Sequence, residues 1–129
     1  MKQIITILLA AIGLTTACGQ RAYRDADAQS FSRLIADSTV IILDVRTPAE
    51  FAESHIQGAI NIDYYQSDFQ QQFVAQLPTD RTIAIYCRSG RRSALAAAML
   101  APKGYRLVNL AGGIIAWREA RLPLVTTEK

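Results

Sequence analysis

The chain has 129 residues, of which 50% are hydrophobic, and a net charge of +3 from 14 lysines and arginines against 11 aspartates and glutamates. This length suits one compact domain with one core. The charge is too mild and too dispersed for a nucleic-acid-binding surface, so we expect no nucleic-acid partner.

The N-terminal residues have the pattern of a secretory signal. Residues 1–3 form a short positive start, residues 4–14 are rich in apolar side chains, and residues 15–17 are small, as a cleavage site requires. The apolar stretch is too short for a transmembrane helix and suits the core of a signal peptide. We therefore predict a signal peptide over residues 1–17 and a location outside the cytoplasm.

Cys18 follows directly and makes this segment similar to a bacterial lipoprotein signal, in which the cysteine is diacylated and becomes the first residue. Thr15 departs from that pattern, since leucine usually holds its place. We expect lipidation of Cys18, attachment to a membrane through the lipid, and localisation in the periplasm or cell envelope. The alternative is ordinary cleavage after Ala17, which leaves a soluble secreted protein. A cytosolic protein with a hydrophobic tail ranks third.

The remaining chain alternates strands and helices. Residues 18–28 are expected to form the anchor cysteine and a short polar tether, and residues 29–126 a single domain. Strands separated by helices favour an α/β fold with a parallel sheet covered on both faces, whose ligands bind beyond the carboxyl ends of the strands. Strands are predicted over residues 40–44, 59–62, 82–86 and 106–110, and helices over residues 28–36, 48–53, 69–77, 93–101 and 113–120.

One cysteine lies at such a strand end and begins the run Cys87-Arg88-Ser89-Gly90-Arg91-Arg92. The free N–H groups and the dipole at the start of the next helix favour an anion there. An ordinary thiol, with a pKa of about 8.5, is only a few per cent thiolate at neutral pH, and neighbouring arginines favour the thiolate. Gly90 permits the positive φ that a tight loop needs. The pattern predicts a reactive thiolate that accepts a group from an anion; a small buried hydrophobic cysteine is the alternative.

The run C-R-S-G-R-R-S at residues 87–93 resembles the active-site loop of the single-domain rhodaneses, the thiosulfate sulfurtransferases. Residues 44–51 and 55–62 are similar to the N-terminal signature of that family. Residues 104–105 and 110–117 are similar to its C-terminal signature. Together these motifs cover residues 29–124, and the resemblance implies the rhodanese-like three-layer fold, with a central and mainly parallel sheet.

The resemblance also implies a mechanism and its residues. The cysteine that matches Cys87 attacks the outer sulfur of thiosulfate or another sulfane donor and becomes a persulfide, from which cyanide or a thiol removes the sulfur. The substrate is then a small sulfur-containing anion, no metal or organic cofactor is needed, and a protein acceptor is possible. Residues of the loop would bind the donor: Arg88, Ser89, Gly90, Arg91 and Arg92.

Several polar residues of the signatures are expected to support the structure. Asp44 has no second carboxylate or histidine at ligand spacing, which favours an ion pair with Arg46 over a metal site. Glu50 is expected to join this pair. His55 is expected to be a structural hydrogen-bonding residue, because a preformed thiolate needs no base, and Trp117 is expected in the core or an interface.

Two positions depart from the family pattern, which commonly has glycine at both. Ser54 precedes the histidine, and Arg121 follows the last predicted helix. A non-glycine residue held at positive φ after a helix costs about 1 kcal/mol. These residues therefore predict a local loss of stability and leave the nucleophile loop untouched.

Other functions stay open. An oxyanion reductase or phosphatase would use Cys-x5-Arg, and Ser93 stands where that arginine would be. A non-catalytic binding module is disfavoured because Cys87 and three arginines are retained. A persulfide or redox relay to a protein partner differs only in its acceptor. If Cys18 is acylated, Cys87 is the one free thiol, and no resolving cysteine remains within the chain.

Overall fold

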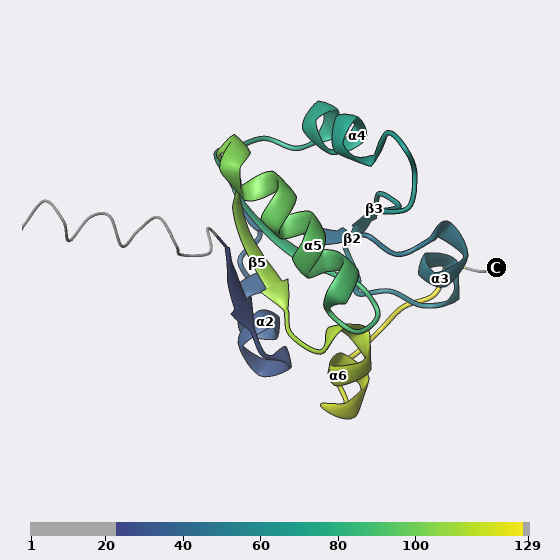
Figure 1. The fold of residues 1–129 in the computed structure, drawn as a ribbon. Helices are drawn as coiled ribbons and strands as arrows, with labels where there is room; N and C mark the ends of the chain where they lie inside the picture. Colours follow the sequence, from purple (N-terminus) through teal and green to yellow (C-terminus); the bar gives the residue numbers. More distant parts are fainter. Residues whose placement is uncertain (1–22, 128–129) are drawn as a thin grey trace, which may run out of the picture.

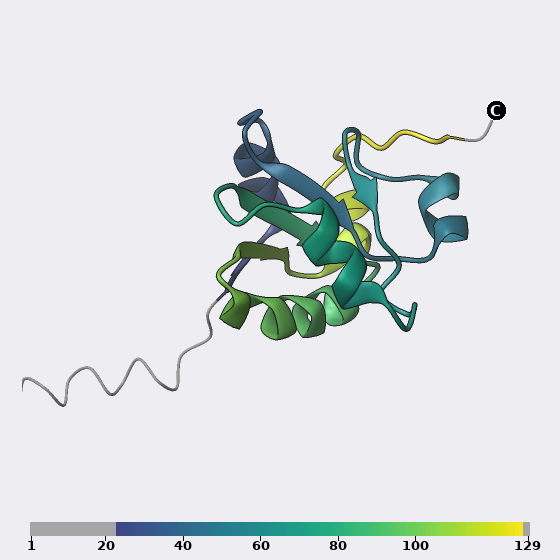
Figure 2. The ribbon, with the colours of Figure 1, turned by 90° about the horizontal axis from the view of Figure 1, so that it is seen from above.

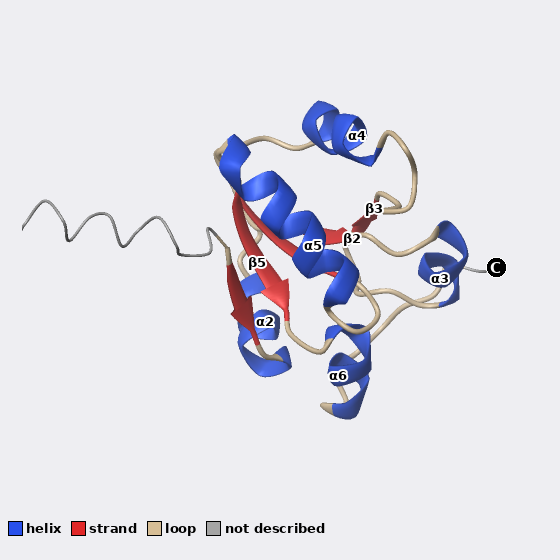
Figure 3. Ribbon diagram, viewed as in Figure 1, coloured by secondary structure: helices blue, strands red, loops and turns tan. Residues whose placement is uncertain are grey.

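The computed structural model describes residues 23–127, and a five-stranded sheet with the order β1-β5-β4-β2-β3 forms its centre (Figure 3). The four neighbouring pairs of strands are all parallel. The predicted α/β class with a parallel sheet is confirmed. The strands are β1 (Arg24–Ala26), β2 (Ile41–Asp44), β3 (Ile60–Asn61), β4 (Thr82–Tyr86) and β5 (Arg106–Leu110).

Helices cover both faces of the sheet and complete three layers (Figures 1 and 2). One core cluster packs Phe73 and Leu100 against one face, and a second packs Phe31 and Ile114 against the other. Both clusters and the five strands lie within residues 23–127, so a chain that begins at residue 20 keeps the whole described fold. The helices are α2 (Ala28–Ile35), α3 (Pro48–Glu53), α4 (Phe69–Gln76), α5 (Arg91–Leu100) and α6 (Gly113–Glu119), with a 3-10 turn η2 (Ala101–Lys103) after α5.

The first strand corrects the predicted tether. Residues 24–26 fall within the tether expected over residues 18–28, but they form β1 and pair with residues 108–110 of β5 at the sheet edge. Only Ala26 of this strand is buried, so three mostly polar residues show no alternating pattern in the sequence. The strand forms because the edge of β5 offers backbone partners that a tether would leave to water.

The predicted signal peptide and Cys18 lie outside the described residues. Within residues 23–127, no helix combines the length and apolar character that crossing a membrane requires.

The central strand, β4, carries the candidate nucleophile. Residues 83–86 of this strand are fully buried, as is typical of a parallel strand covered on both faces. β2 and β5 flank it on either side. The next residue, Cys87, therefore lies at the carboxyl edge of the sheet, where ligands of such folds bind.

A strained residue lies two positions after the end of α6. Arg121 has φ 61° and is the one described non-glycine residue with positive φ. We expect Arg121→Gly to raise the free energy of unfolding by about 0.5–1 kcal/mol in urea denaturation, because glycine adopts this conformation without strain.

Ser54 provides the control for this prediction. Its φ of −170° is extended backbone, so glycine relieves no strain there. Its hydroxyl also accepts a hydrogen bond of 2.6 Å from Arg118. Ser54→Gly should therefore lower stability, and an Arg121→Gly protein no more stable than wild type would contradict the argument.

Candidate active site

The thiol of Cys87 lies inside a cradle of hydrogen-bond donors at the start of α5. Its Sγ accepts hydrogen bonds from the backbone N–H of Gly90 at 3.2 Å, the backbone N–H of Ser93 at 3.4 Å and the hydroxyl of Ser93 at 3.3 Å. Such convergence stabilises negative charge on sulfur. Cys87 has 0% exposure, so a donor molecule reaches the sulfur only when the atoms that cover it move.

Gly90 closes the loop and has the positive φ that its position predicts. It is the N-cap of α5, with φ 96° and no side-chain cap. A Cβ atom here would lie 3.0 Å from the backbone N of Gly112 and 3.2 Å from the carbonyl oxygen of Leu110. The left-handed turn thus directs the amide of Gly90 at the sulfur and allows the loop to pack against the β5–α6 connection.

Ser93 is a site residue that the sequence reasoning missed. The predicted helix began at residue 93, whereas α5 begins at Arg91, which places Ser93 in its first turn. There the backbone N–H and the hydroxyl of Ser93 both face Cys87. The available signal was its position six residues after the cysteine, where Cys-x5-Arg enzymes place their anion-binding arginine.

The loop arginines divide into two groups. Arg88 and Arg91 are exposed, and their guanidinium groups make no hydrogen bond or ion pair with the described residues. Ser89 between them is also exposed. These two cations remain available to an anion that approaches the loop.

Arg92 is engaged by α3 instead. It forms a bidentate pair with Glu50, with N–O distances of 3.0 and 3.1 Å, and its guanidinium carbon lies 5.2 Å from the centroid of the Tyr65 ring. The expectation that Glu50 joins the Asp44–Arg46 pair is therefore wrong, because the fold brings Arg92 to it. In this geometry Arg92 fastens the loop to α3 rather than facing an incoming donor.

The same pair sets the ionisation of Glu50. Hydrogen bonds from Arg92 and from the backbone N–H of Thr47 lower the pKa of Glu50 from 4.5 to about 2, although partial burial opposes the shift. A lowered pKa means that the pair stabilises the folded state fully above about pH 4.5 and loses that effect as the pH falls toward 2.

We expect Glu50→Gln to lower the free energy of unfolding by about 1 kcal/mol at neutral pH. The difference from wild type should shrink as the pH falls from about 4.5 to 2. Urea denaturation across this range measures both. Glu53→Gln removes an exposed carboxylate from the same helix and should leave stability unchanged. A constant difference between wild type and Glu50→Gln at all pH values would refute the assignment.

The start of α6 holds the backbone of the nucleophile loop. The N–H groups of Ile114 and Ile115 donate to the carbonyl oxygens of Cys87 and Arg88 at 3.0 and 3.2 Å. Gly113 has φ 60°, and a Cβ atom there would overlap the carbonyl oxygen of Arg88. The two loops approach this closely only because residue 113 has no side chain.

The expected ion pair of Asp44 and Arg46 is present and buried. Arg46 donates to the Asp44 carboxylate from Nη2 at 2.7 Å and from Nε at 3.0 and 3.1 Å. Its Nη2 also donates to the carbonyl oxygen of Ser54 at 2.6 Å. Burial works to lower the pKa of Arg46, but the hydrogen bonds and charge of Asp44 raise it overall. Asn61 donates to the carbonyl oxygens of both residues. The network ties the carboxyl end of β2 to β3 and to the residue after α3.

His55 lies away from the thiol. Its ring stacks on Phe51 with centroids 3.8 Å apart, its Nδ1 lies 2.8 Å from the Phe51 carbonyl oxygen, and its backbone bridges Val125. Trp117 is buried in the core, where its Nε1 donates to the Pro123 carbonyl at 2.9 Å. Within residues 23–127, no three His, Cys, Asp or Glu side chains gather closely enough to hold a metal ion.

Comparison with known proteins identifies the family to which this chain belongs. The family model of the rhodanese-like domain matches residues 27–120. The chain belongs to the rhodanese family. A sulfurtransferase of Allochromatium vinosum is 42% identical over 106 residues, which cover 81% of this chain and 96% of that relative. The thiosulfate sulfurtransferase PspE of Escherichia coli is 36% identical over 73 residues, 56% of this chain and 68% of its own.

Solved rhodanese structures share the fold. A rhodanese-related protein from Thermoplasma volcanium superposes with a TM-score of 0.72 at 33% identity, and the match covers 80% of this chain and 98% of that one. The rhodanese-like fold predicted from the sequence motifs is confirmed. The chain is thus a rhodanese-like domain whose relatives include sulfurtransferases.

Proposed function

We propose that the chain is a sulfurtransferase that moves a sulfane sulfur from thiosulfate, or a related donor, through a persulfide on Cys87 to cyanide or a thiol. The observation that carries this proposal is the cradle of three donors around the Cys87 sulfur. The exposed cations of Arg88 and Arg91 at the same loop suit a dianionic donor. Relatives named as sulfurtransferases support it.

The proposed reaction has two balanced steps. The Cys87 thiolate attacks the outer sulfur of thiosulfate, a new S–S bond forms to Sγ, the S–S bond of thiosulfate breaks, and sulfite leaves with the electron pair. Cyanide then attacks the terminal sulfur of the persulfide, thiocyanate leaves, and the thiolate returns. Dividing the transfer in this way is covalent catalysis, and it consumes no external oxidant or reductant.

Each part of the loop has a role in these steps. The amides of Gly90 and Ser93 stabilise negative charge on the thiolate and then on the persulfide. Arg88 and Arg91 attract and orient the donor, while the pair of Arg92 with Glu50 keeps the loop closed against α3. A thiol acceptor, either small or on a partner protein, would take the sulfur in the same way as cyanide.

Intact-mass spectrometry tests the proposal. The chain from residue 20 onward contains Cys87 as its single cysteine. Incubation with thiosulfate should add one sulfur atom, about 32 Da, and cyanide should remove it with release of thiocyanate. Protein alkylated beforehand with iodoacetamide is the control and should gain nothing. A reduced, unmodified thiol that gains no sulfur from thiosulfate or other sulfane donors would overturn the proposal and favour a binding module.

Ser93 gives a graded test of the cradle. Ser93→Ala removes one of the three donors and keeps the backbone amide, so kcat/KM with thiosulfate should fall about tenfold to a hundredfold. The assay is thiocyanate formation. Ser67→Ala, in an exposed segment before α4, should leave the rate unchanged. An unaltered rate in Ser93→Ala would remove the hydroxyl from the mechanism.

For localisation, we propose a lipid on Cys18 that anchors the domain outside the cytoplasm. The proposal rests on the pattern of residues 1–18. Full-length protein expressed in bacteria with labelled palmitate should carry the label in the membrane fraction, and Cys18→Ala should lose it. Unlabelled soluble protein cleaved after Ala17 would establish the secreted alternative.

A further inference from the structure

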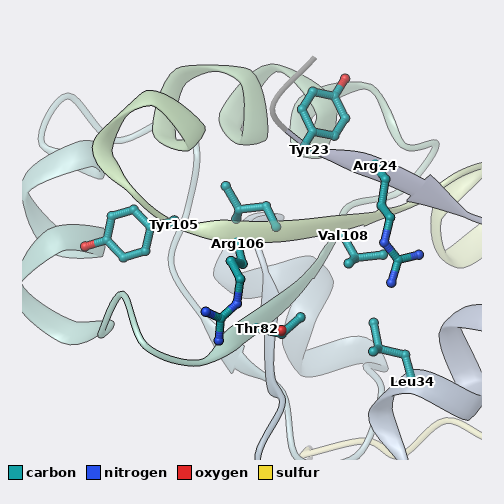
Figure 4. Close-up of a pocket in the computed structure, with 8 residues that line it drawn as sticks. Tyr23, Arg24, Leu34, Thr82, Tyr105, Arg106 and Val108 are labelled. Carbon is teal, nitrogen blue, oxygen red and sulfur yellow. The ribbon is translucent and has the colours of Figure 1, made fainter. Parts of the chain in front are cut away.

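A cavity lies at the amino ends of β4 and β5 (Figure 4), whereas Cys87 follows the carboxyl end of β4. It has a volume of about 480 Å³ and is lined by residues of β1, β4, β5 and α2. Its residues Thr82 and Arg106 are the first of their strands. Because β4 rises about 3.3 Å per residue, the cavity is about 16 Å from the thiol along the strand and is separate from the site described above.

Two arginines line this cavity. Arg24 is in register with Val108, and Arg106 lies two residues earlier on the same strand as Val108, so both arginines point to one face of the sheet. Strand spacing and rise place their Cα atoms about 8 Å apart. Figure 4 shows both side chains on the side of β5 that faces Leu34 of α2. The two guanidinium groups point in different directions in Figure 4, and one anionic group contacts both once these long side chains turn toward each other.

The hydrogen-bond donors of the cavity are largely unused. The guanidinium of Arg24 and the hydroxyl of Thr82 make no hydrogen bond with the described residues. Arg106 donates only from one Nη, at 3.1 Å to the carbonyl of Asp80, and keeps its other donors. No acidic side chain lines the cavity. Asp25, which neighbours Arg24, alternates to the opposite face, where it accepts a hydrogen bond from Asn109.

The rest of the lining is aliphatic or aromatic. Leu34 and Val108 lie beside the two cations, and the remaining lining residues are Leu107 and the aromatic Tyr23 and Tyr105. Two guanidinium forks and a hydroxyl match a group with three or more acceptor oxygens and more than one negative charge, as in a phosphate. The volume is within the range of small-molecule sites. The chemistry thus fits a phosphate joined to an apolar or aromatic moiety.

We propose that this cavity binds a phosphate-bearing molecule, with the phosphate held by Arg24, Arg106 and Thr82 and the apolar part against Leu34 and Val108. A soluble organic phosphate and a phospholipid headgroup share this chemistry. Tyr23 follows Cys18 by five residues, a reach of at most about 18 Å. If Cys18 carries a lipid, the cavity therefore lies close to a membrane, and the experiment must distinguish a phospholipid headgroup from a soluble phosphate. Nothing in the proposal depends on sulfur transfer at Cys87.

Titration of the isotope-labelled chain from residue 20 with phenyl phosphate tests the site by NMR. The backbone amides of Arg24, Thr82 and Arg106 should shift and saturate with a Kd of about 1 mM or tighter. Arg24→Gln and Arg106→Gln should each weaken binding about tenfold. Arg33→Gln removes the same charge from a residue of α2 whose guanidinium donates to Ser30, and should change Kd less than about twofold.

Sedimentation with lipid vesicles distinguishes a phospholipid headgroup from a soluble organic phosphate as the ligand. Binding to phosphatidylglycerol but not phosphatidylcholine vesicles, lost in Arg24→Gln and kept in Arg33→Gln, identifies a lipid headgroup. Phenyl phosphate binding without vesicle binding identifies a soluble phosphate. The proposal is overturned if neither probe binds, if the shifts are confined to residues 88–92, or if Arg33→Gln weakens binding as much as Arg24→Gln does.

Discussion

Cys87→Ser is expected to abolish sulfur loading from thiosulfate and to lower kcat/KM for thiocyanate formation by at least about 10³-fold. A serine hydroxyl stays protonated at neutral pH and forms no persulfide. Serine is the appropriate replacement because the donors of Gly90 and Ser93 converge on this position. An oxygen keeps them partnered, whereas alanine would leave buried donors unsatisfied.

Intact mass and thiocyanate assays measure this loss, and thermal unfolding shows whether the variant is folded. The chain from residue 20 then contains no cysteine, so any sulfur it gains is bound elsewhere. A folded Cys87→Ser protein that still turns over thiosulfate would exclude Cys87 as the sulfur carrier.

Gly113→Ala is expected to lower the free energy of unfolding by about 3 kcal/mol and the rate of sulfur loading by about a hundredfold. The added Cβ would overlap the carbonyl oxygen of Arg88 and lie 2.7 Å from that of Cys87. Both obstacles are backbone atoms, so the nucleophile loop must shift to accept the methyl group. The shift also breaks the hydrogen bonds from Ile114 and Ile115 to the loop.

Gly58→Ala separates steric overlap from backbone strain. Gly58 also has positive φ, at 89°, but a Cβ there meets only the end of Ile42 at the ordinary distance of 3.7 Å. This variant should lose about 1 kcal/mol of stability and keep its sulfur loading. If Gly113→Ala behaves like Gly58→Ala in urea denaturation and loading assays, close packing of the two loops is not what positions Cys87.

The nucleophile loop could be predicted because its signals are local. A buried β-branched strand, a cysteine at its end, and a glycine before a helix follow one another within residues 82–93. Gly90 has the positive φ that this order requires. The role of Ser93 was not predicted, because the helix starts at Arg91, two residues earlier than expected. Only that start turns the Ser93 hydroxyl to the sulfur.

The ion-pair partners of charged side chains were less predictable from the sequence than the nucleophile loop. Chain spacing correctly paired Asp44 with Arg46, since they are two positions apart. It wrongly assigned Glu50 to the same pair. The residue that reaches Glu50 is Arg92, 42 positions away, and it does so because β2 and β4 are neighbours in the sheet.

The sequence by itself determined the alternation of strands and helices, the parallel sheet, and the placement of Cys87 at its carboxyl edge. These features depend on hydrophobic patterns and turn residues that act over a few positions. Only the tertiary structure decided that Arg24–Ala26 join the sheet, that Gly113 admits the loop of Cys87, and that Arg24 and Arg106 share a cavity. Each of these needs backbone or side chains from distant segments to meet, and such contacts form only when the sheet assembles.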